Sequence, residues 1–69
     1  MKLTIEFDRE PNIELTTASY EINLTDRVIY FFDKNDTPTK YISLDGITSI
    51  TETITYFGNR YQKKIYPYK

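Results

Sequence analysis

The chain has 69 residues, no cysteine and no histidine, and its nine basic and ten acidic side chains give a net charge of −1. A chain this short forms one small domain, residues 1–69, that buries only about 60% of the surface exposed by the unfolded chain. Disulfides, thiolate metal sites, and imidazole acid–base chemistry are excluded. We therefore expect no enzyme activity, no metal and no cofactor.

The composition is typical of β-strands, because nine isoleucines, ten threonines and seven tyrosines accompany a single alanine. No apolar run approaches the ~20 residues that cross a bilayer. Four acidic side chains lie within the first 20 residues, where a signal peptide would have an uncharged apolar segment. We expect a cytoplasmic protein without membrane contact. Residues with AT-rich codons number 31 against nine of Gly, Ala, Arg and Pro, which suggests a low-GC bacterium or its phage.

The first expected element is a strand over residues 2–8. Leu3, Ile5 and Phe7 alternate there with polar residues, which predicts one buried and one solvated face. Pro11 cannot donate a ladder hydrogen bond and Asn12 suits a turn, so the chain should reverse after this strand.

The next segment changes parity, because Leu15 lies at an odd position whereas the apolar residues from Ala18 to Leu24 lie at even positions. A shift of one residue turns every later side chain to the other face. The sequence thus requires a bulge near residues 16–17 or a tight turn between two short strands. We favour a bulged or bent strand.

The apolar run at residues 28–32 predicts a central strand covered on both faces. If only one face is covered, Ile29 and Phe31 or their neighbours would face outward and require a partner or a dimer mate. Residues 33–38 are polar and predict a hairpin loop.

A tight turn and a second hairpin are expected after this loop. Ile42 and Leu44 alternate with polar residues before a tight turn at Asp45-Gly46. Ile50 and Ile54 then share even parity and predict a strand, whereas Ile47 has the other parity, so residues 47–50 could instead form one helical turn. Gly58-Asn59 indicates a second hairpin, and Pro67 marks the end of the last strand or a free edge.

The fold expected from these elements is an all-β single domain of five to six antiparallel strands. Short strands at roughly ten-residue spacing are typical of a meander rolled into a small barrel or folded as a compact two-layer sheet. An edge left by incomplete closure would be a natural place for another chain to add.

The acidic residues give no convincing metal or catalytic site. Asp33-x-Asn35-Asp36 resembles the start of a calcium loop, but Pro38 stands where glycine is needed and Leu44 where a bidentate glutamate is needed. Carboxylates of the first two strands could approach one another, yet general acid–base work also needs a cleft. We interpret both sets as solvated surface, and the second set would suit a basic partner.

Charge is uneven along the chain. Residues 1–59 hold five basic and ten acidic side chains, net −5, whereas residues 60–69 hold four basic and no acidic ones, net +4. Cations and aromatic rings alternate in this C-terminal segment, as in single-strand nucleic-acid binders. The simplest interpretation is that Tyr56, Tyr61 and Ile65 fill the core while the lysines are solvated. The candidate binding residues are Tyr56, Arg60, Tyr61, Lys63, Lys64, Tyr66 and Tyr68.

The leading functional hypothesis is a non-enzymatic module that binds another protein, because tyrosine and arginine are enriched in interface hot spots. Its narrower form is a small phage or mobile-element inhibitor of a larger host machine, whose acidic body imitates nucleic-acid charge. The first alternative is a single-stranded nucleic-acid binder, against which the sequence pI of about 5.2 argues. The second is a self-assembling structural subunit, and a homodimer also stays open.

Overall fold

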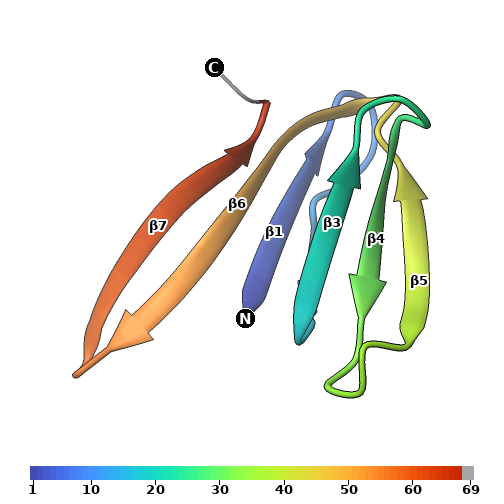
Figure 1. Cartoon of the computed structure of the whole chain (residues 1–69). Coiled ribbons are helices and arrows are strands. Elements are labelled where there is room, and N and C mark those ends of the chain that lie inside the picture. Colours follow the sequence, from blue (N-terminus) through green and yellow to red (C-terminus); the bar gives the residue numbers. More distant parts are fainter. Residues whose placement is uncertain (68–69) are drawn as a thin grey trace.

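The computed structural model describes residues 1–67 and contains seven strands in two antiparallel sheets (Figure 1). The strands are β1 (Lys2–Phe7), β2 (Ile13–Thr16), β3 (Ser19–Asn23), β4 (Val28–Phe32), β5 (Pro38–Ser43), β6 (Ile47–Tyr56) and β7 (Asn59–Tyr66). One sheet has the order β2-β1-β6-β7 and the other the order β3-β4-β5. The predicted small all-β domain of antiparallel strands is confirmed, and of the barrel and two-layer arrangements expected for it, the two-layer arrangement is present. No helix in residues 1–67 is long and apolar enough to span a membrane.

The strand count rises to seven because the predicted bent strand divides between the two sheets. Thr17 still belongs to the first sheet, since its backbone N–H donates to the carbonyl oxygen of Met1 at 3.0 Å. The next residue, Ala18, donates instead to the carbonyl oxygen of Phe32 in the second sheet, at 3.2 Å. The Thr17 hydroxyl is buried at this corner and lies 2.9 Å from the carbonyl oxygen of Ser19 and 3.0 Å from that of Phe32. The corner explains the parity change, because each sheet takes its own apolar set.

The core lies between the sheets and is formed by large aliphatic side chains and one phenylalanine. Its buried members are Leu3, Ile5, Ile29, Phe31, Leu44, Ile47, Ile50 and Ile65. The alternation predicted for β1 is confirmed, since Leu3 and Ile5 are fully buried. In β4, which is central in its sheet as predicted, only Ile29 and Phe31 are buried and the outward residues are half-buried. One face of β4 is therefore fully covered, rather than both.

Bulges bring apolar residues of unequal parity to the same core. In β6, Ser49 pairs with Glu6 but Ile47 pairs with Phe7, so Thr48 is the extra residue. Because of this bulge, Ile47 and Ile50 are both buried, and the alternative of a helical turn is wrong. The Thr48 hydroxyl donates to the carbonyl oxygen of Glu6 at 3.2 Å.

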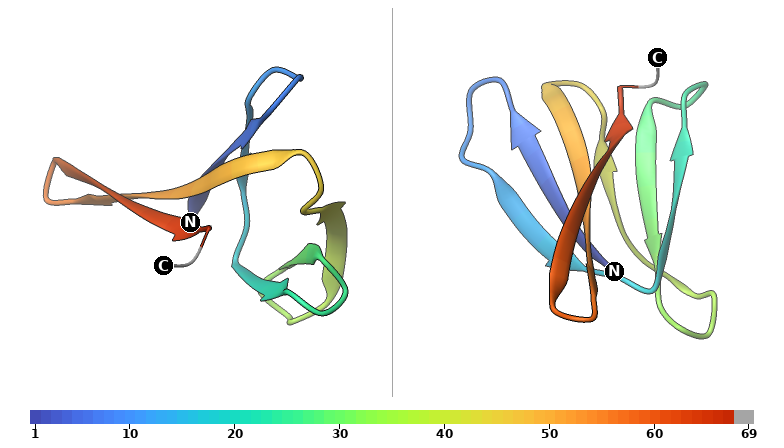
Figure 2. Two further views of the ribbon diagram at one scale, coloured as in Figure 1. Left: turned by 90° about the horizontal axis from the view of Figure 1, so that it is seen from above. Right: turned by 90° about the vertical axis from the view of Figure 1, so that its left-hand side faces the viewer.

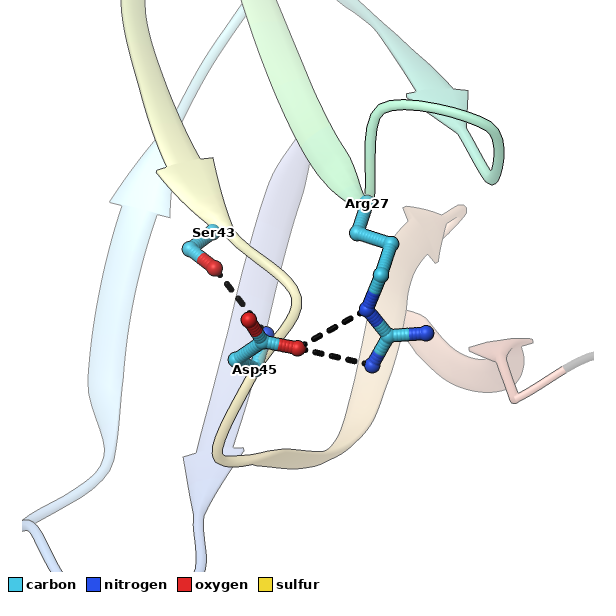
Figure 3. A network of polar contacts seen from close by, with 3 residues as sticks. All are labelled: Arg27, Ser43 and Asp45. Carbon is cyan, nitrogen blue, oxygen red and sulfur yellow. Dashed lines mark hydrogen bonds and ion pairs between the residues drawn. The ribbon is translucent and has the colours of Figure 1, made fainter.

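Two turns meet where β3 leads into β4 and β5 leads into β6. The backbone N–H of Leu44 donates to the carbonyl oxygen of Arg27 at 2.8 Å. The Arg27 guanidinium reaches back to one carboxylate oxygen of Asp45, with Nε at 2.8 Å and Nη2 at 2.7 Å (Figure 3). The hydrogen bond and the charge of Asp45 both raise the pKa of Arg27. The backbone N–H of Asp45 donates to the Ser43 hydroxyl at 3.1 Å, and Gly46 has a positive φ of 86°, so the predicted tight turn is confirmed.

Candidate functional site

The hairpin of β6 and β7 projects beyond the rest of the molecule (Figures 1 and 2). β6 has ten residues, but β1 pairs only with the part of it from Ile47 to Thr53. Beyond Thr53, β6 has only β7 as a neighbour in the sheet. Side chains near the end of this hairpin therefore have little other protein to pack against.

Four apolar or aromatic side chains are exposed at the end of this hairpin, and we call them the tip cluster: Ile54, Tyr56, Phe57 and Tyr61. Ile54 lies directly opposite Tyr61 in the β6–β7 register. The rings of Tyr56 and Phe57 have centroids 4.4 Å apart and are tilted by 33°. Phe57 is 88% exposed, and Tyr56 and Tyr61 are more than half exposed. Exposed apolar residues that gather in one place, rather than singly, mark interaction surfaces.

The turn that carries Phe57 holds it in an unfavourable backbone conformation. Tyr56 pairs with Asn59, so the loop consists of Phe57 and Gly58 alone, with φ of 50° and 79°. Positive φ at both central residues defines a type I′ turn, which favours Asn-Gly or Gly-Gly. A bulky residue at positive φ is an outlier, and such strain gathers at functional sites. The predicted hairpin at Gly58-Asn59 is thus present, with its turn one residue earlier.

The predicted binding residues divide between the two faces of the hairpin. Paired residues share a face, so Tyr61 and Lys63 lie with Ile54 and Glu52, on the side of buried Ile50. Tyr56 belongs to this same inner face. Arg60 and Lys64 pair with Thr55 and Thr51 and lie on the outer face. Tyr66 is half-buried and packs against the core, and Tyr68 lies outside the described residues. The suggestion that Tyr56 and Tyr61 fill the core is wrong, whereas Ile65 does so.

The cations of β7 are exposed and, within residues 1–67, none of them forms an ion pair. The ion pairs of this part of the chain join Lys2 to Glu14, Asp8 to Arg9, and Arg27 to Asp45. Lys63 has an acidic residue, Glu52, directly opposite it in the register. Arg60 and Lys64 face threonines instead. The outer face of β7 therefore carries two positive charges without a neighbouring carboxylate in the paired strand.

A groove of about 260 Å³ separates β7 from β3, the edge strand of the other sheet. Its lining residues are Tyr20, Ile22, Leu24, Lys63, Lys64, Ile65 and Tyr66. The β3 side is apolar, and Leu24 at its end is exposed. Sequence reasoning missed this half of the site, although it recognised the even-numbered apolar set of β3, because only the folded chain places β3 beside β7.

A second aromatic surface lies on the outer face of the three-stranded sheet. The rings of Tyr30 and Tyr41 have centroids 6.2 Å apart, and Tyr41 is 69% exposed. Pro38, Thr39 and Lys40 complete a shallow hollow beside them. This tyrosine pair is separate from the β6–β7 hairpin, so a substitution in it can serve as a control for substitutions in the tip cluster.

The acidic residues show no arrangement that would hold a metal ion. No group of three or more metal-ligating side chains occurs in residues 1–67. In the loop after β4, one carboxylate oxygen of Asp33 accepts hydrogen bonds from the backbone N–H groups of Asn35 and Thr37, at 2.8 and 3.0 Å. This carboxylate thus shapes the loop.

Comparison with protein-family models, curated proteins and solved structures found no match to this chain.

Proposed function

We propose that this protein is a non-enzymatic binding module that acts by protein–protein contact, with the tip cluster as its contact surface. The observation that carries the proposal is Phe57, an almost fully exposed phenylalanine held at positive φ in a turn that favours asparagine. Neither burial nor backbone preference explains this residue. A role as an anchor in a partner's pocket does, because interface hot spots are large aromatic side chains that become desolvated on binding.

The neighbours of Phe57 support the same role. Tyr56 and Tyr61 lie on the inner face of the hairpin with Ile54, so the cluster presents three rings and one aliphatic side chain together. Tyrosine combines a large contact area with few rotatable bonds and a polar tip. The two-stranded hairpin carries these groups away from the body, which allows them to enter a concave surface (Figure 2).

Single-stranded nucleic acid is the alternative ligand, and the distribution of charge favours protein over it. A single-strand binder stacks bases on rings beside cations that neutralise phosphates along the same face. Here Arg60 and Lys64 lie on the opposite face from the rings of Tyr56 and Tyr61, and Lys63 faces Glu52. Fluorescence anisotropy with labelled single strands over a salt series tests this alternative, since binding that depends on Lys63 and Lys64 would support it.

The narrower proposal is an inhibitor of a larger host machine encoded by a phage or mobile element. It rests on the abundance of amino acids whose codons are AT-rich and on the acidic body of the chain. A self-assembling structural subunit is the second alternative. Light scattering over a range of concentrations distinguishes the inhibitor from the structural subunit. The mean particle mass of a self-assembling subunit increases with concentration, whereas that of an inhibitor does not.

The proposed function is tested by affinity capture from a lysate of the encoding organism, with quantitative mass spectrometry. The wild-type chain should retain a stoichiometric protein, and a Phe57→Asn/Tyr61→Thr variant should lose it. A Tyr41→Thr variant is the matched control, since it removes an exposed aromatic ring from the other sheet. Capture that survives the tip substitutions, or that is lost equally in the control, would contradict the proposal.

A further inference from the structure

β7 forms one edge of the four-stranded sheet, so within residues 1–67 no strand is hydrogen-bonded to it on the side away from β6. In the type I′ turn the backbone N–H of Asn59 faces the carbonyl group of Tyr56. Hydrogen-bonding direction alternates along an antiparallel strand. Arg60, Gln62 and Lys64 are therefore the residues whose backbone N–H and C=O groups point to the free edge.

The positive charge of β7 favours pairing with an acidic strand over pairing with β7 of a second copy. β7 carries Arg60, Lys63 and Lys64 and no acidic residue. Antiparallel pairing of β7 with β7 of a second copy would bring these cations against one another, which is unfavourable for directly opposed like charges. A strand with acidic side chains on its outer face would instead meet Arg60 and Lys64.

The groove between β7 and β3 indicates which side chains an added strand would need on its inward face. A segment paired with the free edge of β7 lies between β7 and β3, where its inward side chains face Ile22, Leu24 and Ile65. Lys63 also lines this groove and lies on the same face of β7. Burial of apolar groups against this lining is favourable. The complementary segment thus alternates acidic and apolar residues.

We propose that the edge of β7 accepts an extended segment of a partner protein, alternating acidic and apolar, as a fifth strand of the β2-β1-β6-β7 sheet. The inference rests on the proposed function and names the class of partner segment. Main-chain hydrogen bonds hold the segment, and its alternate side chains give specificity. The tip cluster then contacts a separate part of the same partner.

The probe that tests this inference is a blocked eight-residue peptide of alternating glutamate and valine, added to the ¹⁵N-labelled full chain. Chemical shifts of β7 should change saturably, and amide exchange should slow at Arg60, Gln62 and Lys64. Affinity should fall with added salt. A peptide of alternating lysine and valine should not bind.

Two variants separate backbone pairing from charge. Gln62→Pro removes one backbone N–H at the free edge and leaves the backbone hydrogen bonds to β6 in place, since proline is tolerated at such edge positions. This variant should abolish peptide binding. If this variant fails to fold, N-methylation of the glutamates in the peptide removes the complementary donors instead. Arg60→Glu/Lys64→Glu should weaken binding by about tenfold or more, because glutamates of the variant would then face glutamates of the peptide, and like charges repel. Lys40→Glu, on the edge strand β5 of the other sheet, should have no effect.

The results distinguish this inference from the proposed function. Phe57→Asn should bind the peptide as the wild type does, although it loses the captured partner. Absence of saturable binding at millimolar peptide in low salt overturns the strand-addition proposal, as does equal binding of the lysine–valine peptide. Partner capture that depends on the tip cluster would stand in either case.

Discussion

Replacing Phe57 by asparagine should stabilise the fold while removing the proposed binding anchor. A bulky residue in the left-handed region costs about 1–2 kcal/mol, and asparagine tolerates this region much better. The substitution also loses the ring contact with Tyr56, and such contacts contribute about 0.5–1.5 kcal/mol. We use the lower end of that range, because both rings are exposed. The net stabilisation expected is about 0.5–1.5 kcal/mol.

For a domain of this size, 1 kcal/mol corresponds to about 4–8 °C in Tm, so the Tm of Phe57→Asn should rise by roughly 2–12 °C. Thermal unfolding followed by circular dichroism, with urea unfolding at 25 °C as a second measure, gives this value. Phe57→Ala is the control, because it loses the ring but keeps a side chain poorly suited to positive φ, and it should be no more stable than the wild type. An asparagine variant less stable than the wild type would refute the argument, since the ring pair would then outweigh the backbone strain.

Two predictions concern the core and the corner between the sheets. Ile50 is fully buried, so Ile50→Val should lower the free energy of unfolding by about 0.5–1.5 kcal/mol, measured by urea unfolding. Ile54→Val, in the exposed tip cluster, should lower it less. Equal losses at the two positions would contradict the assigned burial. Thr17→Val keeps the shape of a buried side chain but removes the hydroxyl shared by two carbonyl oxygens, so it should cost about 1 kcal/mol or more in the same assay. Thr16→Val, at the exposed neighbouring position, should leave stability nearly unchanged, and a similar loss at both positions would contradict the role of the corner.

The strands were predictable where one physical constraint dominated locally. Alternation alone places Leu3 and Ile5 on the buried face of β1, because a strand has a period of two and this one has a single dry side. The bend after Leu15 was also readable, since the parity change admits few geometries. The bulge at Thr48 was not, because a helical turn satisfies the spacing of Ile47 and Ile50 equally well and only pairing with β1 decides between them.

The candidate site was predictable in part. Tyr56 and Tyr61 were identified from composition, but the sequence was equally consistent with their filling the core. Their exposure follows from the length of β6 relative to β1, a tertiary relation that no local pattern contains. Phe57 carried the strongest available signal, an aromatic residue directly before glycine in a hairpin turn, but it was not among the candidate binding residues.

The amino-acid sequence by itself determined the all-β class, the alternating core residues and the unusual charge distribution, because these depend on residue type and short-range periodicity. The tertiary structure alone decided which edges stay open and which faces the cations occupy. It also decided that the basic C-terminal strand lies across a groove from the apolar strand β3. The faces of the cations follow from the register of the β6–β7 hairpin. The open edges and the groove depend on contacts between segments separated by some 40 residues, where pairing register, bulges and relative strand length set the outcome.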